Sequence, residues 1–290
     1  MKKLILAVAL VVCAGALAHS ALADRYPELN PLPRHFPTKD RFVHEHAGKG
    51  GSGSNLVYHG GPTITKAHVV PIFWGPSWLP GGADSATADT LGRYIGNFGM
   101  TGEYNTITQY YSGSPATYIQ LSSLSNGGVV RDSSTPPTDV TDAALQAEVS
   151  KYISSNGFDS SAIYEVFLPS SSYSSDGSST SCGGPNLQYC AYHGHFASAY
   201  GDVKYASMPY PSCGGCQSSG FSVAQNFEHF ISHETREAVT DEDLNAWYDR
   251  RGYEADDKCA WSPAPFIDPG TGYAYQYEWS NANSGCVKTR

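Results

Sequence analysis

The segment 222–241 constrains the fold of this 290-residue chain more than any other part of its sequence. Its apolar residues recur at helical spacing and Ser222 is a suitable N-cap, so we expect an amphipathic helix. Burying an ionisable group costs free energy unless the group is paired or binds a metal ion. Four polar residues recur every four positions along one side of this helix: His229, His233, Glu237 and Asp241. We interpret them either as a metal site or as a set of hydrogen bonds and ion pairs.

The centre of this helix, His233-Glu234-x-x-Glu237, differs by one residue from the His-Glu-x-x-His helix of zinc proteases. Side chains one turn apart can share a zinc ion, and the intervening Glu can act as general base toward the water that zinc activates. We therefore expect His233 and Glu237 to bind zinc and Glu234 to be catalytic. Because Glu237 carries a negative charge that a histidine lacks, we expect the zinc-bound water to be less acidic and the enzyme to be less active than a His-Glu-x-x-His protease. Candidates for the oxyanion-stabilising group are Tyr248, Tyr253 and His195.

A third protein ligand is needed for a catalytic zinc site, and the sequence offers several. Asp241, one turn beyond Glu237, and Asp257, in the following segment, rank ahead of Asp243. Further candidates are Glu254 and two histidines that alternate on an expected strand, His193 and His195. The alternative interpretation of these histidines is a solvent-facing pair beside a disulfide.

The N-terminus has the features of a secretory signal peptide. Two lysines precede an apolar run that is too short to span a bilayer, and a small-x-small cleavage site ends at Ala23. The residues that follow are rich in Pro, Gly and Ser and lack periodicity, which indicates a flexible lead-in, either a linker or a propeptide. We predict a signal peptide at residues 1–23, a flexible lead-in at 24–55 and a single domain at 56–290 of a secreted protein, extracellular or periplasmic, without a membrane anchor.

Six cysteines remain after the expected signal peptide, and an even count in an exported chain indicates disulfides. Fifteen pairings are possible, and we favour the local ones. The alternative is a zinc site built on the Cys-x-x-Cys turn that begins at Cys213. The favoured pairs are Cys182–Cys190, Cys213–Cys216 and Cys259–Cys286.

The formal net charge is −9 and no basic surface is evident, which argues against nucleic acid or anionic membrane as a partner. Charged residues make up only 16% of the chain, as suits an extracellular protein. The 20 tyrosines and five tryptophans would also supply stacking surfaces for a polysaccharide, although most of them belong in a core or on an ordinary surface. We expect a monomer that acts on an extracellular peptide or protein.

Periodicity predicts strands at 68–74, 163–168, 190–196 and 203–209 and helices at 84–111, with a break near Gly102, and at 138–155. Pro71 indicates that the first strand lies at an edge or a bulge. The Ser-rich segment 170–181 is expected to be an exposed, mobile loop. Strands that immediately precede a ligand-bearing helix favour an α+β fold with a mixed sheet, in one disulfide-crosslinked domain.

Several short motifs, in order along residues 56–290, together make the chain resemble the phosphate-induced, exordium-like family of secreted proteins. They are Tyr58-His59-Gly60-Gly61-Pro62, Cys190 with its histidine-containing strand, Cys213-x-x-Cys216, Ser232-His233-Glu234-x-x-Glu237-Ala238, Asn245-Ala246-Trp247-Tyr248, Glu254-x-x-Asp257-x-Cys259 and Trp279-Ser280-Asn281. The resemblance implies secretion and one domain. Plant members of the family are apoplastic proteins linked to growth control, and bacterial members carry the same helix.

Two functions follow from these expectations. The first is a secreted zinc-dependent endopeptidase of zincin-like architecture, with a mixed sheet packed on the active-site helix and Glu234 as general base. The second is a non-enzymatic extracellular growth, signalling or cell-wall factor on the same scaffold. A polysaccharide-binding protein is less favoured, and a serine hydrolase least, because no Gly-x-Ser-x-Gly sequence occurs.

Overall fold

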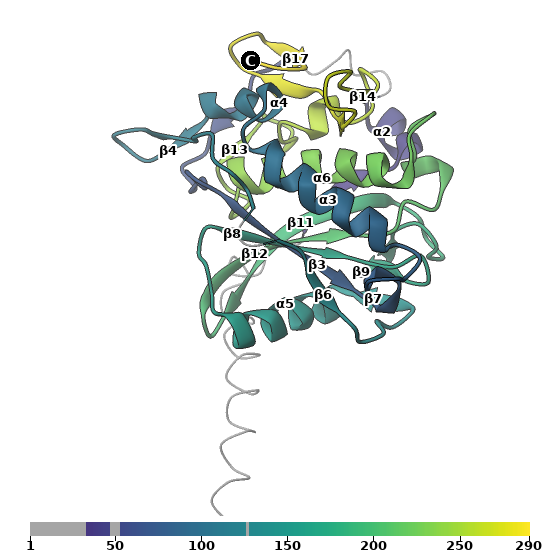
Figure 1. Ribbon diagram of the computed structural model, residues 1–290. Coiled ribbons are helices and arrows are strands. Elements are labelled where there is room, and N and C mark those ends of the chain that lie inside the picture. Colours follow the sequence, from purple (N-terminus) through teal and green to yellow (C-terminus); the bar gives the residue numbers. More distant parts are fainter. Residues whose placement is uncertain (1–32, 47–52, 126–127) are drawn as a thin grey trace, which may run out of the picture.

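The computed structural model of the protein describes residues 33–46, 53–125 and 128–290, which form one mixed α+β domain (Figure 1). The expected signal peptide at 1–23 lies outside the described residues. A six-stranded sheet in the order β1-β11-β12-β8-β3-β6 runs through the domain. Its strands are β1 (Arg34–Pro37), β3 (His68–Trp74), β6 (Val130–Asp132), β8 (Ala162–Phe167), β11 (Tyr189–Ser198) and β12 (Gly201–Met208).

The sheet is mixed, as the sequence indicated. Strands β12, β8, β3 and β6 run parallel to one another, whereas β11 pairs antiparallel with both β12 and β1. The expectation that Pro71 marks an edge strand is wrong, because β3 lies between β8 and β6. Pro71 is nevertheless tolerated, since β6 pairs with β3 only from Ile72 onward and the bridge to Ser125 is made by Val69.

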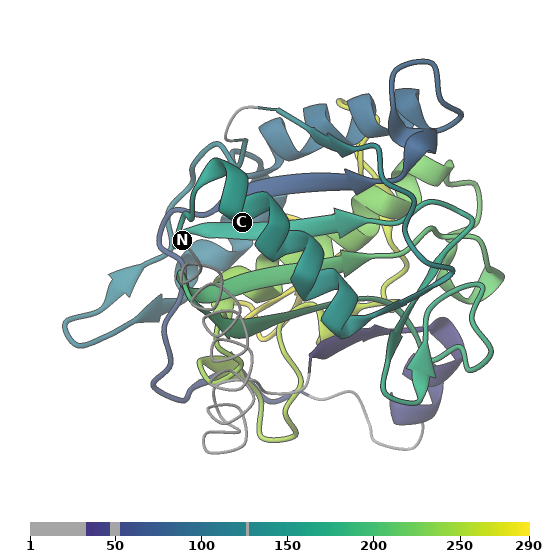
Figure 2. The ribbon, with the colours of Figure 1, turned by 90° about the horizontal axis from the view of Figure 1, so that it is seen from below.

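Helices cover both faces of the sheet. Helices α6 (Val223–Thr240) and α3 (Ser85–Phe98) lie on one face and α5 (Asp142–Asn156) crosses the other, as Figures 1 and 2 show. The side chains of β8 alternate between the two apolar clusters: Ile163 and Phe167 pack with the α6 side, Tyr164 and Val166 with the α5 side. Burial on both faces explains why this strand is almost uniformly apolar.

The other elements are short. Strands β9 and β10 form a small sheet with β7, and the expected mobile loop at 170–181 is therefore largely ordered. The first predicted helix is interrupted near Gly102 as expected, since it ends at Phe98 and α4 begins at Gly102, whereas residues 139–141 of the second predicted helix are a strand. The remaining elements are α2 (Lys39–His46), α4 (Gly102–Asn105), β2 (Val57–Tyr58), β4 (Tyr111–Ser112), β5 (Thr117–Tyr118), β7 (Asp139–Thr141), β9 (Tyr173–Asp176), β10 (Ser179–Thr180), β13 (Trp247–Tyr248), β14 (Phe266–Ile267), β15 (Ala274–Tyr275), β16 (Glu278–Ser280) and β17 (Gly285–Val287).

Part of the expected lead-in, 24–55, forms regular secondary structure. Residues 34–37 form β1 on the edge of the main sheet, and residues 39–46 form α2. Phe36 is fully buried and Phe42 is 5% exposed. The domain therefore begins before the predicted boundary at 56, because two phenylalanines in a polar segment suffice to bury it against the core.

The described residues form three disulfides, of which the sequence predicted only Cys259–Cys286. The other two are Cys182–Cys213 and Cys190–Cys216, so the local pairs Cys182–Cys190 and Cys213–Cys216 are wrong. Cys213 and Cys216 stand at the two ends of a short 3₁₀ turn, and each end meets a different preceding segment. The packing of this turn against β11, and not the short distance between cysteines along the chain, therefore decides which cysteines pair.

Candidate metal centre

Helix α6 has a well-defined start and an almost completely buried body. Ser222 accepts a hydrogen bond from the backbone of Gln225, whose side chain accepts one from the backbone of Ser222, which forms a capping box. Asp241 is the C-terminal cap. The body lies between the sheet and the C-terminal segments, so its polar residues point into protein on every side.

His233 and Glu237 lie one turn apart on α6 and meet as predicted. The His233 Nε2 atom is 3.1 Å from Oε2 of Glu237 and 3.8 Å from Oδ1 of Asp257. The Asp257 backbone N–H donates to Oε1 of Glu237 at 2.8 Å, which holds the segment after the helix against it. Potential ligand atoms of the three residues lie within 4.8 Å of one another.

A second group of ligands shares Glu237. It consists of His193 on β11, Glu237 and Glu254, again with ligand atoms within 4.8 Å of one another. The His193 Nε2 atom lies 3.6 Å from Oε1 of Glu254. On the other side of its ring, Nδ1 lies 2.9 Å from Oε2 of Glu234. The alternative of solvent-facing histidines on this strand is wrong, because His193 and His195 are both buried.

Each of the two central histidines is held through its Nδ1 atom. His193 Nδ1 bonds to Glu234, and His233 Nδ1 lies 3.1 Å from Oε1 of Gln276. Gln276 Oε1 also faces Nε2 of His229 at 3.0 Å, and an amide oxygen can only accept. Nδ1 of His233 therefore carries its proton when the ring is neutral, which leaves Nε2 as the free ligand atom.

Burial dominates the electrostatics of the centre. It lowers the pKa of His233 well below its ordinary value, so the ring is neutral near pH 7. It raises the pKa of Glu234 to about 8 and that of Glu254 to about 7. Burial also raises the pKa of Glu237, and the nearby charge of Asp257 raises it further. So many buried carboxyl groups in one place favour either protonation of some of them or binding of a cation.

Strand β1 covers the centre. Phe36 stacks on the His233 ring, with centroids 4.2 Å apart, and on Trp261 at 5.2 Å. Arg34 is paired with His193 across the β1–β11 ladder, and its Nε atom lies 3.9 Å from Glu254. Access to the centre is therefore limited on this side by a segment from the N-terminal part of the chain.

A pocket of about 340 Å³ opens beside β1 and reaches Asp257, whose side chain is 15% exposed. Arg34, Arg251 and Tyr253 are among its lining residues. Asp257 thus connects the buried ligands to the surface. Of the predicted oxyanion candidates, Tyr253 lies on this route, whereas Tyr248 stacks on His59 at 3.7 Å.

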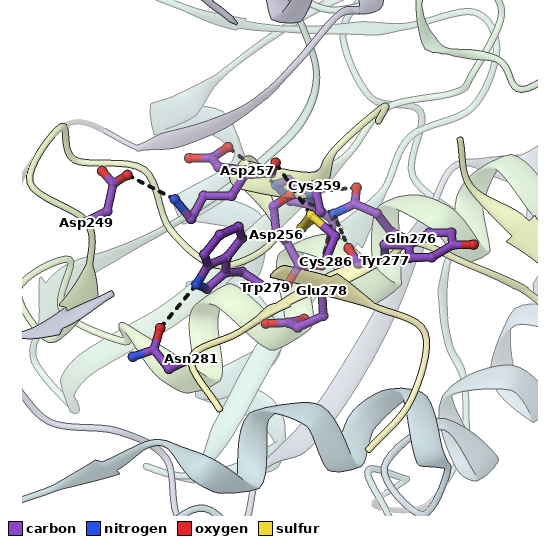
Figure 3. The surroundings of a disulfide bond; sticks show 12 residues. Asp249, Asp256, Asp257, Cys259, Gln276, Tyr277, Glu278, Trp279, Asn281 and Cys286 are labelled. Atoms are coloured by element: carbon purple, nitrogen blue, oxygen red, sulfur yellow. Dashed lines mark hydrogen bonds and ion pairs between the residues drawn. A yellow bond between two sulfur atoms is a disulfide. The ribbon is translucent and has the colours of Figure 1, made fainter. Parts of the chain in front are cut away.

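The Cys259–Cys286 disulfide crosslinks the segment that supplies Asp257, and Figure 3 shows its surroundings. The neighbouring Asp256 is fully buried and pairs with Arg236 of α6, whose Nε atom also lies 2.5 Å from Glu278. This buried ion-pair network fixes the backbone from which Asp257 projects. Gln276 donates to the Asp256 carbonyl at 2.8 Å and so joins the network to the histidines.

Three predicted candidate ligands, Asp241, Asp243 and His195, lie outside both groups. Asp241 accepts a hydrogen bond from the backbone N–H of Ala246, as a cap at the end of the helix. Asp243 bonds to Lys204, and so does Asp202, which also accepts from His195 Nδ1 at 2.8 Å. His195, Asp202 and Asp243 form a third cluster, in which both carboxylates already form ion pairs with the ammonium group of Lys204.

Sequence reasoning missed Gln276, Phe36 and Arg34. Gln276 stands in an unremarkable tail, and only contact with α6 gives it a role. The signal for Phe36 was an isolated aromatic residue in a segment that composition marked as flexible.

No helix within the described residues is long and apolar enough to cross a membrane. Comparisons with models of known families, with curated proteins and with solved structures found no match to this chain.

Proposed function

We propose that the chain is a secreted, metal-dependent hydrolase that cleaves peptide bonds, with a divalent cation such as zinc held by His233, Glu237 and Asp257. The observation that carries the proposal is the convergence of a neutral Nε2 atom and two carboxylates at 3.1 and 3.8 Å. Imidazole with carboxylate is a donor set that zinc accepts. When bound, zinc supplies a Lewis acid that activates water and polarises a carbonyl.

Glu234 suits the role of general base. Its Oε2 atom accepts from His193, while Oε1 is buried and has no hydrogen-bond partner among the described residues. One oxygen is therefore fixed and the other is available to take a proton from water and return it to the leaving amine. The carboxyl group must be ionised to do so, which a nearby cation favours because it offsets the effect of burial.

The test combines metal content with turnover. Purified protein should contain zinc and cleave a library of unfolded peptides, and Glu234→Gln should keep the zinc while hydrolysis falls by about 10²–10⁴-fold. Glu228→Gln is a matched control, since Glu228 is a buried glutamate of the same helix that bonds to the Ala274 backbone, outside both ligand groups. Zinc-loaded wild-type protein that cleaves nothing in the library would contradict the proposal.

One observation favours the second candidate, a non-enzymatic extracellular factor such as the resemblance to exordium-like proteins implies. His233, Glu234 and Glu237 are at most 1% exposed, and β1 lies over them. A metal held so deeply would stabilise the fold without meeting a substrate. In that case Glu234→Gln should leave the extracellular biological activity unchanged.

A further inference from the structure

The two ligand groups of the candidate metal centre are arranged as two adjoining sites. One consists of His233, Glu237 and Asp257, the other of His193, Glu237 and Glu254. Glu237 belongs to both. Its Oε2 atom lies 3.1 Å from His233 Nε2 and 3.8 Å from the His193 ring, at the Nδ1 atom that also bonds to Glu234.

Ligand spacing separates the two histidines. Ligands of one zinc ion lie about 2.0–2.3 Å from it, so two of them are at most roughly 4.6 Å apart. The atoms within each group satisfy this limit to within a few tenths of an ångström, whereas His193 and His233 fall in different groups. The geometry therefore gives each histidine one carboxylate of its own, Glu254 for His193 and Asp257 for His233, in addition to the shared Glu237.

Both histidines have one ring nitrogen in a hydrogen bond and the other free to bind a metal ion. Each has its Nδ1 atom engaged, by Glu234 or by Gln276, and neither Nε2 atom has a hydrogen-bond partner among the described residues. Both side chains are at most 1% exposed. A buried imidazole nitrogen without a hydrogen bond costs free energy, and a metal ion would remove that cost.

The charge of the centre also exceeds what one ion can balance. Glu234, Glu237 and Glu254 are fully or almost fully buried, and Asp257 borders them. Arg34 contributes one positive charge from the rim. Even with the charge of Arg34, four ionised carboxylates would keep one excess negative charge beside a single divalent cation, whereas two divalent cations would balance the four carboxylates by themselves.

We propose that the centre binds two divalent cations, one at each group, with the carboxylate of Glu237 bridging them. The inference rests on the proposed metal-dependent function and extends it from one ion to two. Imidazole and carboxylate donors suit zinc and manganese. In paired-metal hydrolases the two ions share the stabilisation of the attacking and leaving oxygens, which defines the class of reaction this site would support.

The experiment counts ions in the full chain. Metal-free protein, prepared with a chelator, is titrated with Zn²⁺ alone, and bound zinc is measured by calorimetry and elemental analysis. The wild type should bind two ions, and Glu254→Gln and His193→Ala should each bind one. His233→Ala should also bind one, and Glu237→Gln should weaken both sites by at least tenfold. His195→Ala is the matched control, because His195 is also a buried β11 histidine bonded to a carboxylate, and it should still bind two.

Titration with Mn²⁺ supplies an independent readout, since two bridged manganese ions give an exchange-coupled electron paramagnetic resonance spectrum that isolated ions do not. One zinc ion in the wild type, or two in His193→Ala and Glu254→Gln, would overturn the inference. Two uncoupled manganese ions would overturn the bridge. If the protein hydrolyses peptides with one bound ion, the proposed function holds and the two-ion inference is wrong. If it binds two ions but hydrolyses no peptide, the two-ion inference holds and the proposed function is wrong.

Discussion

The Nδ1 atom of His193 lies 2.9 Å from Oε2 of Glu234, which joins strand β11 of the sheet to the middle of helix α6. The bond orients the imidazole, so that Nε2 points toward Glu254. It also fixes one oxygen of the glutamate that we propose as general base. A single contact thus couples the geometry of the ligands to that of the catalytic group.

Zinc should stabilise the protein against heat. A ligand present at about 100 times its dissociation constant adds about 2.7 kcal/mol, which corresponds to a rise of roughly 5–10 °C in Tm for a domain of this size. Differential scanning calorimetry with and without chelator measures the shift. His233→Ala, which removes one of the two histidine ligands, should lose a large part of it, whereas His195→Ala should keep it. An equal zinc effect in both variants would refute the assignment of His233 as a ligand.

Replacing Arg236 should destabilise the fold strongly. Arg236 is fully buried and pairs with Asp256 and Glu278, so Arg236→Met leaves two buried carboxylates without their cation. The expected loss is about 3–5 kcal/mol in the free energy of unfolding, measured by urea denaturation. Arg93→Met, at an exposed position of α3, should change stability by less than about 0.5 kcal/mol. A loss below about 1 kcal/mol for Arg236→Met would be incompatible with this network.

Glu165 should make stability depend on pH. It is fully buried, Thr235 donates a hydrogen bond to it at 2.6 Å, and burial raises its pKa from 4.5 to about 8. The folded state therefore holds a proton that the unfolded state releases above pH 4.5, so stability falls as pH rises from about 4.5 to 8. Glu165→Gln should remove this part of the loss and be more stable than the wild type by about 1–3 kcal/mol at pH 9. Urea denaturation of both proteins at pH 5 and pH 9 measures the effect. If the difference in free energy of unfolding between them is the same at both pH values, the prediction is wrong.

Loosening β1 should open the metal centre. Phe36→Ala removes the ring that stacks on His233 and Trp261, and truncating a buried Phe costs about 3–5 kcal/mol. Part of that loss should appear as local detachment of β1, so we expect a chelator to extract zinc at least about tenfold faster. Phe196→Ala, in the apolar cluster on the other face of the sheet, is the control. Equal extraction rates in the two variants would show that β1 does not control access.

The third disulfide should support metal affinity. Cys259 follows Asp257 by two residues, so the double variant Cys259→Ser and Cys286→Ser frees the segment that carries this ligand. Zinc affinity should fall by about 10–100-fold, as for other changes that affect ligand orientation. Replacing Cys182 and Cys213 by serine should weaken zinc binding less, because that bridge lies away from Asp257 in the chain. Peptide mapping should recover the three pairs of the structure.

The sequence predicted the part of the site that is local. A spacing of four residues on one helix brings His233 and Glu237 together whatever surrounds them, and the Ser222 cap and apolar spacing predicted that helix. The same reasoning failed for Asp241. It continues the four-residue spacing, but the helix ends there and its carboxylate accepts a hydrogen bond from Ala246 in the loop that follows. Local spacing is informative only as far as the helix itself extends.

The sequence by itself determined an α+β fold with a mixed sheet, the helix at its centre, a cysteine set that forms disulfides, and the pairing of His233 with Glu237. Only the tertiary structure decided that β11 contributes His193, that Glu254 and Asp257 form separate groups with Glu237, and that β1 covers them. The same holds for two of the three disulfides. The physical reason is that periodicity reports contacts within one element, whereas these contacts join segments tens of residues or more apart, whose register is set by burial of the whole core.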